Sequence, residues 1–222
     1  MSGSVKKVPI TWAKMPKNGI LIITGHRGEG KTALAWWLAE TVKKQHRKKK
    51  ITAVGIPEVA HQHLPKRVNH VPADSALTFL DKTKGHVVIV DEASIIASSR
   101  DAMSEQNKAW LKLIRVIRQK DHLLIFISQH NRGLDVQIMM DADYVLMKRP
   151  TAMHLRLTKP EFRKEMRIAY DLFQDIPEKE SKGKVYVVDY QFENHNMLTA
   201  KMPKWWTKKV STMYGDAQVL QV

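Results

Sequence analysis

The chain contains no cysteine, which excludes disulfide bonds and thiolate metal sites. No stretch approaches the ~20 consecutive apolar residues that a membrane-spanning helix needs. The segment from Ser2 to Lys17 is too polar for the apolar core of a secretory signal. We therefore expect a soluble, cytoplasmic protein with no membrane span.

Acidic residues are scarce relative to basic ones. The chain has 37 lysines and arginines against 22 aspartates and glutamates, a net charge of +15 and a pI near 9.9. This excess favours a polyanionic partner, most simply nucleic acid, although a basic solvated surface is the plain alternative. With 222 residues, 43% of them hydrophobic, the chain is long enough for one α/β domain with a real core.

Residues 20–32 carry the most informative pattern, Ile-Leu-Ile-Ile-Thr-Gly-His-Arg-Gly-Glu-Gly-Lys-Thr. Its four apolar residues predict a buried strand, and apolar residues at helical spacing follow it up to about residue 45. Between strand and helix lies glycine-x4-glycine-lysine-threonine, the phosphate-binding P-loop pattern in the context it requires. A simple glycine turn explains this combination less well.

The spacing of the P-loop residues explains their chemistry. Glycines let backbone N–H groups converge on phosphate oxygens, and the following helix adds positive charge from its dipole. Lys31 would reach the β- and γ-phosphates, and the Thr32 hydroxyl would bind magnesium. The predicted cofactors are ATP and Mg²⁺. The predicted nucleotide-binding residues are Gly25, His26, Arg27, Gly28, Glu29, Gly30, Lys31 and Thr32.

A second apolar run, residues 86–90, ends in Asp91 and Glu92. It predicts a fully buried parallel strand, and ligands bind at the carboxyl ends of such strands. Asp91 is the predicted magnesium residue, and Glu92 is the predicted general base for an attacking water. The alternative is a polar strand end that opens a loop.

Three further polar residues are candidates for catalysis. Gln129 ends the strand predicted at residues 123–127, which we expect beside the strand before Asp91. A side chain there could sense the γ-phosphate. Arg115 and Arg118 lie three apart on a predicted helix, and one or both could reach a nucleotide held by a neighbouring subunit. Taken alone, the arginine spacing favours a solvated helix face.

A basic run follows the P-loop helix. Cations at a helix carboxyl end are partly explained by the dipole, but this run exceeds that need. It is the predicted contact with the DNA backbone, through Lys43, Lys44, Arg47, Lys48, Lys49 and Lys50.

The chain is predicted to form one domain, 1–222, with a lead-in at 1–18, an ATPase core at 19–150 and an elaboration at 151–222. In the last part, residues 166–172 fit a strand or a helix. We interpret them as a strand paired with residues 185–188 in an antiparallel hairpin. Residues 205–214 predict a terminal helix that Gly215 stops. The predicted fold is α/β, a mainly parallel sheet flanked by helices, with this C-terminal hairpin added.

Residues 113–122 read Leu-Ile-Arg-Val-Ile-Arg-Gln-Lys-Asp-His and precede an apolar strand ending in Ser128-Gln129. Together with Asp91-Glu92 and residues 142–149, this resembles the FtsK–HerA superfamily of DNA-translocating ATPases. The resemblance covers roughly residues 18–150. Residues 202–206, with Ser211 and Tyr214, look similar to the end of zonula-occludens-toxin-like phage ATPases.

The resemblance implies an ATP-driven translocase of double-stranded DNA that works as a homo-hexameric ring. The size is most similar to genome-packaging ATPases of membrane-containing icosahedral viruses, which implies a capsid or portal-vertex partner, location in the host cell cytoplasm and association with the virion. Three alternatives remain: a phage assembly or extrusion ATPase, a nucleotide kinase, and a nucleotide-switched DNA-binding protein without turnover.

Overall fold

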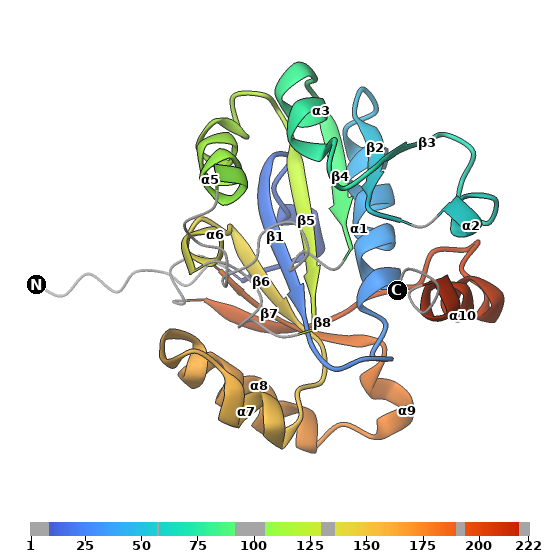
Figure 1. The fold of residues 1–222 in the computed structure, drawn as a ribbon. Helices are drawn as coiled ribbons and strands as arrows, with labels where there is room; N and C mark the ends of the chain where they lie inside the picture. Colours follow the sequence, from blue (N-terminus) through green and yellow to red (C-terminus); the bar gives the residue numbers. More distant parts are fainter. Residues whose placement is uncertain (1–8, 57, 92–104, 130–135, 190–193, 218–222) are drawn as a thin grey trace, which may run out of the picture.

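The computed structural model describes residues 9–56, 58–91, 105–129, 136–189 and 194–217. Eight strands in this part of the chain form one sheet between two layers of helices, in the order β3-β2-β4-β5-β1-β6-β7-β8 (Figure 1). From β3 to β6 all neighbours are parallel, whereas β7 and β8 are antiparallel additions. The strands are β1 Gly19–Thr24, β2 Lys50–Val54, β3 Val68–Val71, β4 His86–Val90, β5 Leu123–Ser128, β6 Tyr144–Met147, β7 Lys184–Asp189 and β8 His195–Thr199.

Helices cover both faces of the sheet. The short 3-10 segments are η1 Trp12–Lys14 and η4 Pro160–Phe162. The α-helices are α1 Lys31–Gln45, α2 Glu58–His61, α3 Ala76–Lys82, α5 Glu105–Val116, α6 Val136–Met140, α7 Ala152–Leu157, α8 Arg163–Gln174, α9 Glu178–Ser181 and α10 Lys208–Ala217. In the described residues, none of these helices combines the length and the apolar character needed to cross a bilayer.

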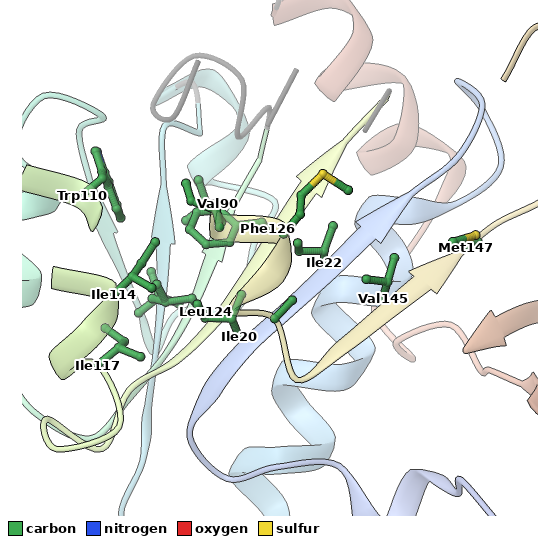
Figure 2. Close-up of a cluster of buried hydrophobic side chains, with 14 of the residues drawn as sticks. Ile20, Ile22, Val90, Trp110, Ile114, Ile117, Leu124, Phe126, Val145 and Met147 are labelled. Atoms are coloured by element: carbon green, nitrogen blue, oxygen red, sulfur yellow. The ribbon is translucent and has the colours of Figure 1, made fainter. Parts of the chain in front are cut away.

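The central strands are apolar on both faces because each face has its own core. On one face, Trp110 and Ile114 of α5 and Ile117 directly after it point toward the sheet (Figure 2). The sheet residues that meet them include Ile20, Ile22, Val90, Leu124 and Phe126. On the other face, the apolar side of α1 packs against alternate residues of the same strands, such as Leu21 and Ile23.

The parallel part of the sheet confirms the predicted α/β class. The P-loop strand and helix, the strand before Asp91 and the strand before Gln129 all form where the sequence predicts them. β5 pairs with β4, as expected, and also with β1. The carboxyl ends of β1, β4 and β5 therefore lie together on one side of the sheet, which we call the carboxyl edge.

The C-terminal third requires corrections. Residues 166–172 are not a strand but part of α8, because Met166, Ala169 and Phe173 form one buried helical face. The preceding residues Ala152–Leu157 form the helix α7. An antiparallel hairpin is present, but β7 pairs with β8 and not with residues 166–172.

Two smaller differences concern segments between elements and at the end of the chain. No strand is predicted from the sequence at residues 68–71, yet they form the edge strand β3. The terminal helix α10 begins at Lys208 rather than Trp205 and continues past Gly215. Trp205 instead packs edge-to-face on Trp36 of α1, with ring centroids 5.4 Å apart.

A pair of buried histidines closes the opposite, amino edge of the sheet. The His86 ring contacts the Thr52 hydroxyl at 2.8 Å, and its backbone N–H donates to Nδ1 of His122. Burial is the main cause that lowers the pKa of His86 to about 4, and His122 and nearby lysines lower it further. Both residues are almost fully buried in the protein interior.

Candidate nucleotide site

The loop between β1 and α1 has the backbone that its glycines permit. Gly28 and Gly30 have φ of 82° and 80°, in the left-handed region that side chains disfavour. Gly25 has φ of 143° and packs against β6, where an added Cβ would lie 2.8 Å from the Lys148 Cβ. The first glycine is therefore needed for close approach, whereas the other two are needed for conformation.

Lys31 lies across this loop. It is the first residue of α1, and its Nζ donates to the backbone oxygen of His26 at 2.9 Å. Only 8% of the residue is exposed. The ammonium is thus held over the concavity of the loop, where phosphate oxygens of a nucleotide would be received.

Thr32 and Asp91 meet although they are far apart in sequence. The Thr32 hydroxyl donates to Oδ2 of Asp91 at 3.3 Å, and both residues are half-buried. Magnesium prefers oxygen ligands and commonly binds one carboxylate together with phosphates and water. A hydroxyl and a carboxylate converging beside a phosphate loop fit that ion, so these two residues would hold it.

Gln129 directly follows β5 at the same edge, where Ser128 pairs with Thr24. Its backbone oxygen lies 3.2 Å from Nε2 of His154, a buried residue of α7. The other ring nitrogen of His154 contacts the Thr151 hydroxyl at 2.7 Å. The His154 ring also lies edge-on to that of His26, with centroids 6.0 Å apart. His154 therefore links α7 to both the P-loop and the end of β5.

Lys148 is a second residue beside the loop that the sequence interpretation missed. It is 1% exposed, and its Nζ donates to the backbone oxygens of Lys182 and Lys184. Burial lowers its pKa to about 8, and the charge of Glu29 in the P-loop partly opposes this shift. The residue ties β6 to the start of β7 directly behind Gly25.

Glu92, the expected general base, lies outside the described residues. Its role stays a prediction that depends on its position next to Asp91. The roles of His26, Arg27 and Glu29 in nucleotide binding also stay predictions.

The two candidate arginines lie at the amino edge, away from the P-loop of their own chain. Arg115 and Arg118 line a hollow of about 190 Å³ together with Gly19, Ile20, Ile114, Ile117 and Asp141. Arg118 forms an ion pair with Asp143, although 61% of its side chain is exposed. Asp143 also accepts a hydrogen bond from the Ile20 N–H at 2.8 Å. Their action on a nucleotide held by a neighbouring subunit stays a prediction.

The basic run after α1 is partly structural. Lys49 is 3% exposed, and its Nζ donates to the backbone oxygen of Asp121 and pairs with its carboxylate. Lys43 donates to the backbone oxygen of Lys49 at 2.6 Å. The buried Lys49 is not available for the predicted DNA contact. Lys44, Arg47, Lys48 and Lys50 are exposed and remain candidates.

Comparisons with known proteins test the fold. Neither a protein-family model nor a curated protein sequence matches the chain. The genome packaging NTPase B204 from Sulfolobus turreted icosahedral virus 2, in complex with ATP-gammaS, matches with a TM-score of 0.61 at 15% identity. The match covers 84% of this chain and 99% of that one. The same protein in complex with AMP matches with a TM-score of 0.63 at 14% identity, over 85% and 100% of the two chains.

This chain has the fold of a P-loop ATPase. The pCW3 conjugation coupling protein TcpA matches with a TM-score of 0.54 at 13% identity, over 92% of this chain and 65% of that one. Thermomonospora curvata EccC matches with a TM-score of 0.55 at 10% identity, over 84% of this chain and 37% of that one. The fold implied by the FtsK–HerA resemblance is confirmed by these neighbours.

Proposed function

We propose that this P-loop ATPase is an ATP-driven translocase of double-stranded DNA that packages a viral genome into a capsid. The observation that carries the proposal is the contact of Thr32 with Asp91 beside Lys31. These residues come from two places in the chain that lie 59 residues apart, and their arrangement would suit a magnesium nucleotide. A glycine turn with a merely structural role would not need them together.

The neighbours direct the proposal toward packaging. B204 is described as a genome packaging NTPase and as a DNA-packaging ATPase, and almost its whole length is matched. TcpA is described as a conjugation coupling protein. The positive charge of the chain supports a nucleic-acid partner.

In the proposed reaction, Lys31 would hold the β- and γ-phosphates while Thr32 and Asp91 hold magnesium. The ion would neutralise charge on the phosphate oxygens. Glu92 would accept a proton from the attacking water, and Gln129 would orient that water at the end of β5. Arg118 or Arg115 of an adjacent subunit would complete the site in a hexameric ring that docks on a capsid or portal vertex.

The test is phosphate release with and without double-stranded DNA, alongside light scattering for the assembly state. The wild type should hydrolyse ATP, and DNA should raise the rate. Lys31→Ala should fold and show no turnover. Unchanged turnover in a folded Lys31→Ala protein would refute the site, and DNA-independent turnover would favour an ATPase of another kind.

A further inference from the structure

The exposed charges of helix α8 lie in the order that its own dipole disfavours. Arg163, Lys164 and Arg167 occupy its first five residues, whereas Asp171 and the C-cap residue Asp175 lie at its other end. All five side chains are exposed. The amino end of a helix bears partial positive charge, so cations there and carboxylates at the carboxyl end both lower helix stability.

The contacts of α8 do not explain these cations either. The helix buries its opposite side, including Met166 and Glu165, and the Glu165 carboxylate accepts a hydrogen bond from Tyr186 at 2.5 Å. Within the part of the chain that the structure describes, the three cations form no ion pair or hydrogen bond. Their positions are therefore not explained by the stability of this fold.

Helix α7 and the segments beside it extend the same charge. From residue 149 to residue 167 there are six cationic side chains and two carboxylates, Glu161 and the buried Glu165. Arg156 of α7 is exposed, and α7 packs against α8. We call the exposed residues Arg156, Arg163, Lys164 and Arg167 the α7–α8 cationic surface.

The basic run after α1 provides a contrast. Lys43 and Lys44 lie in the last turn of α1, where the dipole favours cations. Lys49 is buried against Asp121. Lys43, Lys44 and Lys49 thus have structural explanations, and the run lies at the amino edge, about 22 Å along α1 from the P-loop at ~1.5 Å per residue.

The α7–α8 cationic surface instead lies on the side of the nucleotide site. Glu165, next to Lys164, bonds to Tyr186, and Tyr186 pairs with Met147 at the carboxyl end of β6. His154 of α7 contacts the backbone oxygen of Gln129. In Figure 1, α7 and α8 lie side by side below the sheet, at the end where β1 leads into α1. A ligand on these helices would therefore lie close to the residues that would sense the nucleotide.

We propose that the α7–α8 cationic surface binds the phosphate backbone of double-stranded DNA. The inference rests on the proposed function, since it names the surface through which the translocase holds its substrate. Among the described residues, these four exposed cations have no ion-pair or hydrogen-bond partner, which suits a polyanion of regular charge spacing. Arginines can also bind phosphate through two N–H groups at once. The contact through His154 offers a route from that surface to Gln129.

The salt dependence of DNA affinity makes the proposal quantitative. Each phosphate contacted by a cation adds about 0.9 to the slope of log affinity against log salt. Loss of three contacts should therefore flatten the slope by about 2.7. Between 50 and 200 mM salt, the wild type should lose about 40-fold more affinity than a variant without the three α8 cations.

The experiment compares two triple variants of the full chain on one labelled DNA duplex of arbitrary sequence. The first combines Arg163→Gln, Lys164→Gln and Arg167→Gln. The matched control combines Lys44→Gln, Arg47→Gln and Lys48→Gln, which removes equal charge at the amino edge. Affinity is measured across a salt series, and thermal unfolding is measured in parallel.

We expect the α8 triple to flatten the slope and to unfold at the same or a higher temperature, because it relieves the unfavourable dipole contacts. The control should flatten the slope less than the α8 triple does. A wild-type slope in the α8 triple, or a flattened slope only in the control, would overturn the surface while leaving the proposed function intact. A wild type that binds DNA without salt dependence would overturn both.

A charge-retaining variant separates the role of charge from that of shape. Arg163→Lys with Arg167→Lys should keep the wild-type slope, since phosphate neutralisation needs only the cation. A flattened slope in this double variant would show that charge at these positions is not what binds DNA.

Discussion

Replacing Gly25 by alanine should damage the P-loop more than the same change at Gly28. At Gly25 the new Cβ would lie 2.8 Å from the Lys148 Cβ and 3.1 Å from the Lys148 backbone oxygen. At Gly28 it would meet no atom within 4 Å. Both glycines have positive φ, so both changes introduce backbone strain, but only the first also forces β6 and the loop apart.

The expected losses in the free energy of unfolding follow from the backbone strain and the steric overlap. Backbone strain at a position with positive φ costs about 1–3 kcal/mol. Overpacking in a tight site adds about 1–3 kcal/mol. We expect Gly28→Ala to lower the free energy of unfolding by about 1–2 kcal/mol and Gly25→Ala by about 2–5 kcal/mol. Part of the larger effect should be relieved by displacement of the loop, which would weaken nucleotide binding.

The assay pairs urea unfolding with titration of a fluorescent ATP analogue on the wild type and the two variants. Gly25→Ala should be the less stable protein and should bind the analogue more weakly than Gly28→Ala. Equal stability and equal affinity in the two variants would refute the packing of Gly25 against Lys148 and with it the geometry assigned to the site.

Three further experiments address the general base, the arginines and the buried histidine. Glu92→Gln should bind ATP but hydrolyse it about 10²–10⁴-fold more slowly; phosphate release near the wild-type rate would assign the base elsewhere. Arg118→Ala should bind ATP without turnover, and mixing it with Glu92→Gln should return some activity; equal turnover by a dilute monomer would argue against a shared site. The unfolded chain titrates His86 near pH 6.5 and the folded chain near 4, so stability should be full above pH 6.5 and fall by about 3 kcal/mol as the pH drops to 4. His86→Gln should lose most of that dependence in urea titrations, and an unchanged pH profile would contradict it.

The central parallel strands could be predicted because the sequence patterns that indicate them are local. Strands buried on both faces appear as uninterrupted apolar runs, such as residues 86–90, and the P-loop pattern marks the turn between β1 and α1. The edge strand β3 was missed because its side chains are only partly buried and its sequence, Val-Asn-His-Val, is short and polar.

Residues 166–172 in the C-terminal third were assigned wrongly because their apolar pattern fits both the period of a strand and the period of a helix. Met166, Ile168, Tyr170 and Leu172 alternate as in a strand, yet Leu172 is 40% exposed and Phe173 is fully buried. Packing of α8 against the sheet decided between the two, and packing is not visible in a local window.

The candidate site was predictable where one motif holds the residues together. The P-loop and Asp91 could be paired from their types and order, and the structure places Thr32 and Asp91 in contact. The roles of Lys148 and His154 could not be predicted, because their contacts are with residues 25 to 36 positions away. A buried lysine and a buried histidine have no local signature.

Displacement of a third strand from duplex DNA tests the central claim most directly. A triplex-forming oligonucleotide bound to a linear duplex is released when a translocase moves along the duplex, so release reports movement rather than binding. The wild type should release it in the presence of ATP and magnesium, and Lys31→Ala should not. ATP turnover stimulated by DNA with no release of the third strand would contradict translocation, whereas DNA binding without any turnover would assign the protein to nucleotide-switched DNA binding.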